Sequence, residues 1–86
     1  MWRVYVPKPV LKALARLPAR DAERIWAALG GMEQDPFDGD IRDLGDKTYR
    51  RRVGSYRVRF RVDWSTRLVS VLWVDRRTST TYRKRR

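Results

Sequence analysis

Apolar and polar positions at the start of the chain follow the period of a β-strand. Residues 2–6 (Trp-Arg-Val-Tyr-Val) alternate between two faces and are rich in aromatic and β-branched side chains, which predicts a short strand. Pro7 and Pro9 end this strand and suit the first turn of a helix. We therefore expect a strand that leads directly into a helix.

Two segments with helical periodicity follow, separated by Pro18. Gly30 and Gly31 mark the place where the second helix is expected to fray or end. The apolar positions are Val10, Leu11, Leu14 and Leu17 in the first segment, and Ala22, Ile25, Trp26, Leu29 and Met32 in the second. Each set lies on one face of a helix, so the two segments predict a helical hairpin.

Residues 34–48 are expected to form an acidic loop. Aspartate and glycine dominate the segment, and Pro36 interrupts any helix. Ile41 and Leu44 are apolar and are expected to pin the loop to the core. Its aspartates lack the spacing and the terminal glutamate of an EF-hand loop, so we expect no metal site.

Strand patterns return in the second half of the chain. Residues 49–53 and 56–62 flank Gly54-Ser55, a two-residue turn typical of a β-hairpin. Residues 68–74 are nearly all apolar, as expected of a central strand covered on both faces. The order predicts an α+β domain: an N-terminal strand, a helical hairpin, and a three-stranded antiparallel meander, with both helices on one face of the sheet.

Pairing the hairpin strands across Gly54-Ser55 gives one apolar face and one basic face. The expected core face carries Tyr49, Val53, Tyr56, Val58, Phe60 and Val62, and the opposite face carries Arg50, Arg52, Arg57, Arg59 and Arg61. Arg51 falls on the core side. It either reaches solvent at an edge or marks a bulge that shifts the pairing.

The basic face opposes like charges. Arg52 faces Arg57 and Arg50 faces Arg59, and such pairs destabilise a sheet by up to about 1 kcal/mol each. A phosphate-binding surface explains why they are present, because arginine offers phosphate oxygens a planar, permanently charged fork. A solvated charged face is the structural alternative.

The distribution of charge supports a polyanionic partner. The net charge is +11. Residues 1–48 contain 8 basic and 8 acidic side chains, whereas residues 49–86 contain 13 basic and 2 acidic ones. An excess confined to one segment is typical of nucleic-acid binding, with a solubilising basic tail as the alternative.

Aromatic residues are assigned by their periodicity. Trp2, Trp26 and Trp73 fit core positions and are expected to be packing residues, whereas Trp64 in a turn is undecided. Tyr82, in the basic tail that begins at about residue 76, is the best candidate for stacking on a base, with an ordinary surface tyrosine as the alternative.

Composition excludes several kinds of chemistry. The 86 residues predict a single domain, and they include neither cysteine nor histidine. Disulfides, thiolate or histidine metal sites and histidine acid–base catalysis are therefore excluded. The sequence shows neither a signal peptide nor a run of apolar residues long enough to span a membrane, so a cytoplasmic location is expected.

Residues 49–62 (Tyr-Arg-Arg-Arg-Val-Gly-Ser-Tyr-Arg-Val-Arg-Phe-Arg-Val) resemble the hairpin signature of the RelE/ParE toxin superfamily. In that family the hairpin precedes a hydrophobic strand and an end with arginine and tyrosine, here Arg76 and Tyr82. Lys12-Ala-Leu-Ala-Arg-Leu17, Asp35-Pro36 and Leu44 match the upstream helix, loop and leucine of the family. The resemblance covers most of the chain and implies two helices packed on a four-stranded sheet.

The resemblance implies a toxin of a type II toxin–antitoxin system. The RelE branch consists of endoribonucleases that cleave mRNA in the ribosomal A site without a metal or cofactor, which inhibits translation. The ParE branch instead inhibits DNA gyrase, and a catalytically inactive nucleic-acid binder is a third possibility. Toxins of both branches are kept inactive by a cognate antitoxin. We therefore expect the protein to be a monomer alone and to form a hetero-oligomer with its antitoxin. The further expected partners are mRNA and the ribosome.

The resemblance also implies roles for individual residues. Arg57 matches the hairpin arginine on the scissile phosphate, and Arg76 matches the C-terminal arginine, a role that Arg77 can also take. Arg50 and Arg52 stand where the ribosome-dependent type has lysines. Arginine is a poor general base because its pKa lies far above neutral and its guanidinium stays protonated, so Tyr82 is the candidate base. Further expected RNA contacts are Arg59, Arg61, Arg77, Arg83 and Lys84. Asp75 is expected to form an ion pair with its arginine neighbours.

Overall fold

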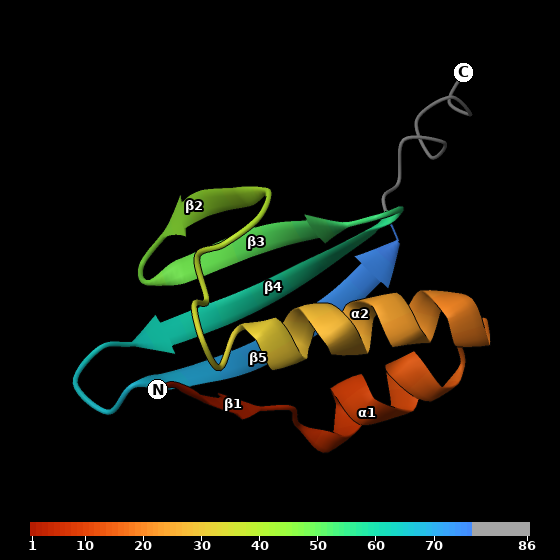
Figure 1. Cartoon of the computed structure of the whole chain (residues 1–86), viewed down its shortest axis with the longest axis horizontal. Helices are drawn as coiled ribbons and strands as arrows, with labels where there is room; N and C mark the ends of the chain where they lie inside the picture. Colours follow the sequence, from red (N-terminus) through yellow and green to blue (C-terminus); the bar gives the residue numbers. More distant parts are fainter. Residues whose placement is uncertain (77–86) are drawn as a thin grey trace.

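The computed structural model describes residues 1–76, which form a five-stranded sheet with two helices packed on one face (Figure 1). The elements are β1 (Arg3–Tyr5), α1 (Lys8–Ala15), α2 (Ala19–Gly31), β2 (Ile41–Gly45), β3 (Thr48–Val53), β4 (Tyr56–Asp63) and β5 (Leu68–Arg76). The strands lie in the order β1-β5-β4-β3-β2, and only β1 and β5 run parallel within these residues. The predicted α+β class is confirmed, with its N-terminal strand, helical hairpin and antiparallel meander.

The core lies between the helices and the inner face of the sheet. Val10 and Leu14 of α1 and Ile25 and Leu29 of α2 are buried against the strands. From β4 and β5 the core receives Tyr56, Val58, Phe60, Val62, Val69, Val71 and Val74. Alternation along β4 buries every second side chain, which leaves its arginines on the outer face, the face turned away from the helices.

The fifth strand was not predicted. β2 lies inside the segment expected to be a loop, where it pairs with β3 as a short edge strand. Its register breaks between Asp43 and Gly45, and Leu44 is 45% exposed. Of the two residues expected to pin the segment, Ile41 packs against the core and Leu44 does not. Pairing with β3 outweighs a local composition that disfavours a strand.

Two of the three expected core tryptophans are on the surface. Trp2 is buried, but Trp26 and Trp73 are each 43% exposed. Trp73 belongs to β5, whose buried residues all lie on the helix side, while Leu72 is 45% exposed. The expectation that β5 is covered on both faces was therefore wrong, because the described residues place both helices on one side of the sheet.

The hairpin register agrees with the prediction at all of its pairs, from Val53 with Tyr56 to Tyr49 with Phe60. Arg51 consequently points to the core side, and no bulge shifts the β3–β4 pairing. The loop before β2 covers this side chain. A Cβ atom at Gly39, which has a φ of +99°, would lie 2.9 Å from Arg51 Nε.

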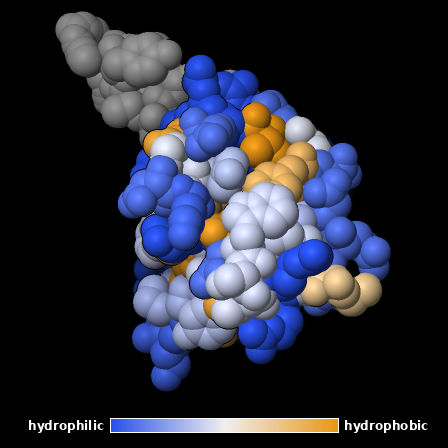
Figure 2. Space-filling model, turned by 90° about the vertical axis from the view of Figure 1, so that its left-hand side faces the viewer, coloured by the Kyte–Doolittle hydropathy of each residue, from blue (hydrophilic) through white to orange (hydrophobic). Residues whose placement is uncertain are grey.

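A cluster of aromatic rings closes the end of the sheet that carries the β4–β5 turn. Phe37 stacks on Trp64 with 5.3 Å between ring centroids, and both rings also meet Trp2 edge-on. Figure 2 looks at this end of the molecule, where a pale and orange patch is framed by strongly hydrophilic surface. Trp64, undecided from the sequence, thus packs on other rings although it is 57% exposed.

Candidate nucleic-acid interface

Three neighbouring strands place six arginines on the outer face of the sheet. We call this set the arginine face: Arg42, Arg50, Arg52, Arg57, Arg59 and Arg61. Arg42, Arg50 and Arg59 form one cross-strand row, and Arg52 and Arg57 form the next. In Figure 1 the helices lie in front of the sheet, so the arginine face points away from the viewer. The sheet thus brings together the five arginines predicted from the hairpin.

Arg42 is the member that sequence reasoning missed. It lies on β2, within the segment expected to be a loop, and pairs directly with Arg50. The only available signal was the Ile41-Arg42 step, which is too short to establish alternation. Once β2 pairs with β3, the position of Arg42 opposite Arg50 follows from the register.

Burial and the crowding of positive charge act together on Arg50. Partial burial lowers the pKa of Arg50 below its ordinary value, and neighbouring arginines lower it further. Those arginines are Arg42, Arg52 and Arg57, while Asp40 acts in the opposite direction. Because the repulsion between these cations falls when an anion binds among them, the arginine face is suited to phosphate.

Arg57 faces Asp75, an acidic residue of the outer face, across the β4–β5 pairing. Its Nε lies 3.6 Å from Asp75 Oδ1, and neither atom has a hydrogen-bond partner within the described part of the chain. Asp75 was predicted to form an ion pair with its arginine neighbours in the sequence, but within the described residues its partner is Arg57 across the sheet and not the adjacent Arg76. An incoming phosphate oxygen would compete with this carboxylate for Arg57.

The remaining predicted site residues differ in their placement. Arg61 donates from Nη1 to the backbone oxygen of Asp46 over 3.2 Å. Arg76 does not join the arginine face, because it pairs with Tyr56 and its guanidinium lies 5.8 Å from the centroid of that ring, on the helix side. Arg77, Tyr82, Arg83 and Lys84 lie outside the described residues, so their roles stay predictions.

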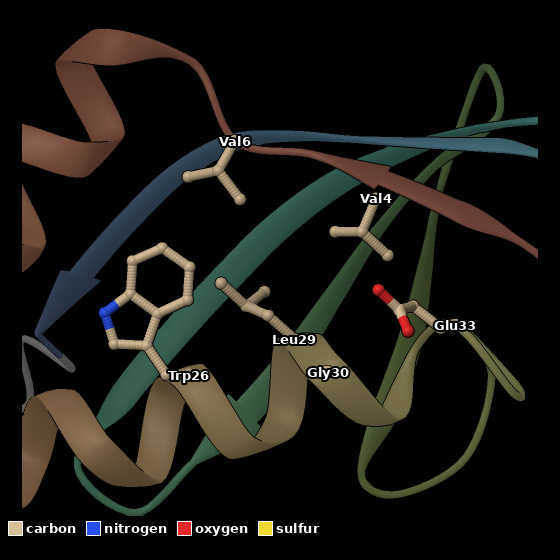
Figure 3. Close-up of a pocket in the computed structure, with 6 residues that line it drawn as sticks. All are labelled: Val4, Val6, Trp26, Leu29, Gly30 and Glu33. Atoms are coloured by element: carbon tan, nitrogen blue, oxygen red, sulfur yellow. The ribbon is translucent and has the colours of Figure 1, made fainter.

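A separate apolar groove lies on the helix side of the sheet. Its volume is about 160 Å³, and it lies between β1 and α2 (Figure 3). Val4, Val6, Trp26, Leu29, Gly30 and Glu33 line it. Since Glu33 is the charged residue of this lining, the groove is not suited to a phosphate, and the arginine face is the better candidate for a polyanion.

Residues 1–76 contain no cluster of three or more acidic, histidine or cysteine side chains that could hold a metal ion. Neither of the two helices there combines the length and apolar character required to cross a membrane. Within these residues the arginine face is therefore the candidate site for a polyanion.

Comparison with known proteins identifies relatives over most of the chain. No protein-family model matches the sequence. A curated relative from Methanocaldococcus jannaschii, provisionally named toxin RelE1, is 27% identical over 81 residues, which is 88% of this chain and 90% of the relative.

Solved structures show the same architecture. In the RelE–RelB complex from Pyrococcus horikoshii, the matching chain has a TM-score of 0.83 and 29% identity, over 91% of this chain and 97% of that one. In the toxin–antitoxin complex RelBE2 from Mycobacterium tuberculosis, the values are 0.77 and 25%, over 88% and 98%. Sequence and fold are similar over almost the full length of these relatives, which supports the expected resemblance to the RelE-like toxin superfamily.

Proposed function

We propose that this protein is the toxin of a type II toxin–antitoxin pair and an endoribonuclease that cleaves mRNA in the ribosomal A site, in the cytoplasm. The observation that carries the proposal is the arginine face, which gathers six cations on three adjacent strands with Asp75 at its border. A structural sheet gains nothing from directly opposed arginines, whereas an RNA strand neutralises them.

The proposed reaction is an attack by the ribose 2′-oxygen on the adjacent phosphorus. The 2′-O–P bond forms, the P–O5′ bond breaks, and the products are a cyclic phosphate and a 5′-hydroxyl. A base takes the proton of the 2′-hydroxyl, an acid supplies one to the leaving oxygen, and cations stabilise the charge on the phosphate oxygens. This chemistry requires no metal ion.

The described residues supply the electrostatic part of this reaction. Arg57 is assigned to the scissile phosphate, whose oxygens replace Asp75 as its partner. Arg50 and Arg52 lie beside it on β3 and hold the flanking phosphates or stabilise the leaving oxygen. Tyr82 stays the candidate base from the sequence, since a positive surrounding favours phenolate. Arg76, whose guanidinium lies near the Tyr56 ring, keeps the role that the resemblance implies only as a prediction.

An antitoxin is the proposed protein partner. The similar structures from P. horikoshii and M. tuberculosis are complexes of a toxin with its antitoxin. An acidic or amphipathic antitoxin segment that covers the arginine face would block RNA by occupying the same cations.

A purified translation reaction tests the proposal. The protein is added to an mRNA with and without ribosomes, and new 5′ ends are mapped by primer extension. We expect cuts at A-site codons only in the presence of ribosomes. Arg57→Ala should abolish them, whereas Arg20→Ala, on the exposed surface of α2, is the matched control.

The alternatives predict other outcomes. Cuts without ribosomes would show a free ribonuclease. No cuts, together with loss of DNA supercoiling by gyrase, would support the ParE-type reading and refute ours. RNA binding without cleavage or gyrase inhibition would show an inactive relative.

A further inference from the structure

We infer that Trp73, with Leu72 and Tyr5 beside it, is a platform on which bases of a single-stranded RNA stack while the phosphates lie on the arginine face. The inference rests on the proposed function, because it takes RNA as the ligand. These three side chains are 43%, 45% and 57% exposed. They belong to β5 and β1, the two strands of the sheet beyond the arginine face.

A β-bulge brings Trp73 to the outer face. Arg59 pairs with Trp73 and Phe60 pairs with Val71, so Leu72 is an extra residue in β5. Simple alternation from the buried Val71 would place Trp73 in the core. The inserted residue reverses the alternation along β5 and leaves the side chains of Leu72 and Trp73 exposed. Bulges near functional sites often turn a side chain to the other face in this way.

The cross-strand register places this patch directly against the arginines. Trp73 continues the row of Arg42, Arg50 and Arg59. Tyr5 pairs with Ser70, which pairs with Arg61, so Tyr5 lies at the β1 end of a second row, the one that contains Arg61. The outer face is therefore basic over β2–β4, whereas over β5 and β1 it carries the large exposed side chains of Trp73, Leu72 and Tyr5. Ser70, Asp75 and Arg3 are the polar residues on this part of the face.

A nucleotide has two parts that match the two parts of this surface. Its phosphate is an anion that suits the arginines, and its base, on the other side of the sugar, is a flat π-system that suits the Trp73 ring. Adjacent strands are about 4.8 Å apart, so a chain whose phosphates follow β4 presents its bases toward β5. Stacking on an aromatic ring needs a free base, which selects single-stranded over duplex RNA and is tolerant of sequence.

The test compares two tryptophans of equal exposure. Trp73→Ala is measured against Trp26→Ala, which removes a ring that is also 43% exposed but lies in the groove on the helix side (Figure 3). Binding is measured for a fluorescein-labelled 2′-O-methyl RNA dodecamer, which cannot be cleaved through its 2′-oxygen, and for inorganic polyphosphate, which has charge but no bases.

We expect Trp73→Ala to weaken RNA binding roughly 5- to 100-fold, as loss of base stacking does, with an unchanged dependence on salt. Polyphosphate binding should be unaltered, Trp73→Phe should restore most of the RNA affinity, and Trp26→Ala should bind like the parent. Quenching of tryptophan fluorescence by RNA should be lost in Trp73→Ala alone.

Three results for Trp73→Ala would overturn the platform. The variant could bind RNA as tightly as the parent, or its affinities for RNA and polyphosphate could fall equally. It could also keep its RNA affinity but no longer bind the antitoxin, which would make the patch a protein-docking surface. If the parent itself binds neither RNA nor polyphosphate, the proposed function fails and the platform with it. The parent's own binding thus separates the two failures.

Discussion

The arginine face makes a quantitative prediction about the salt dependence of RNA binding. Each phosphate neutralised on a single strand contributes about −0.7 to the slope of log K against log salt. Four members of the face have no carboxylate within ion-pairing distance in the described residues, namely Arg42, Arg50, Arg52 and Arg59. Replacing all four by glutamine should therefore flatten the slope by roughly 3.

The size of this effect makes it easy to measure. Between 50 and 200 mM salt, the parent should lose roughly 50-fold more affinity than the four-glutamine variant. The assay is fluorescence anisotropy with the uncleavable dodecamer at several salt concentrations. Basic residues after Arg76 add to the slope of both proteins, so the difference between the slopes is the quantity to compare.

A matched control and a stability measurement complete the experiment. Arg20→Gln, on α2, changes one charge on the helix side and should leave the slope as it is. The four-glutamine variant should unfold in urea at a concentration no lower than the parent, because it relieves opposed like charges. A slope unchanged in this variant, or flattened equally by Arg20→Gln, would refute the assignment of RNA to the outer face.

Three further predictions concern the fold. Phe60→Ala empties a fully buried position and should lower the free energy of unfolding by about 3–5 kcal/mol in urea titrations. Tyr56 Oη donates to Asp21 Oδ2 over 3.0 Å, and burial first, then this bond, raises the pKa of Tyr56. Folding therefore favours the neutral phenol, and Tyr56 stabilises the folded protein below a pH of about 10 but loses this contribution as the pH rises further. In urea titrations across pH, Tyr56→Phe should lack this loss of stability at alkaline pH. Hydrogen bonds from Ser65 and Thr66 lower the pKa of Asp63. The ionised carboxylate therefore stabilises the folded protein above a pH of about 4, and this contribution is lost as the pH falls. Asp63→Asn should lack this loss of stability in acid titrations followed by circular dichroism.

The hairpin was predictable because its pattern and its turn agree. Gly54 has a φ of +59°, a conformation that favours glycine, and it fixes a two-residue turn. A fixed turn sets the register, and strict alternation then sets both faces. The five hairpin arginines and their opposed pairs followed from these two facts.

Residues that depend on distant pairing were not predictable in the same way. β2 exists because β3 offers it a partner, so Arg42 could not be placed from local sequence. Trp73 was misplaced because the insertion at Leu72 changes the parity of β5, and nothing in an apolar run marks an inserted residue. Arg51 was recognised as a misfit, but the loop at Gly39 that covers it was not visible.

The parallel pairing of β1 with β5 has a consequence for how the molecule is made. β1 spans Arg3–Tyr5 and its partner on the sheet is Leu68–Ser70, so these contacts join segments from opposite ends of the described chain. The helical hairpin consists of local contacts and can form while synthesis continues, but β1 stays unpaired until β5 has left the ribosome. β5 also supplies Trp73 and Asp75 to the outer face. A nascent chain that stops before β5 therefore carries the hairpin arginines without the strand that joins β4 to β1. The sheet becomes complete only after translation of its own message has passed residue 76.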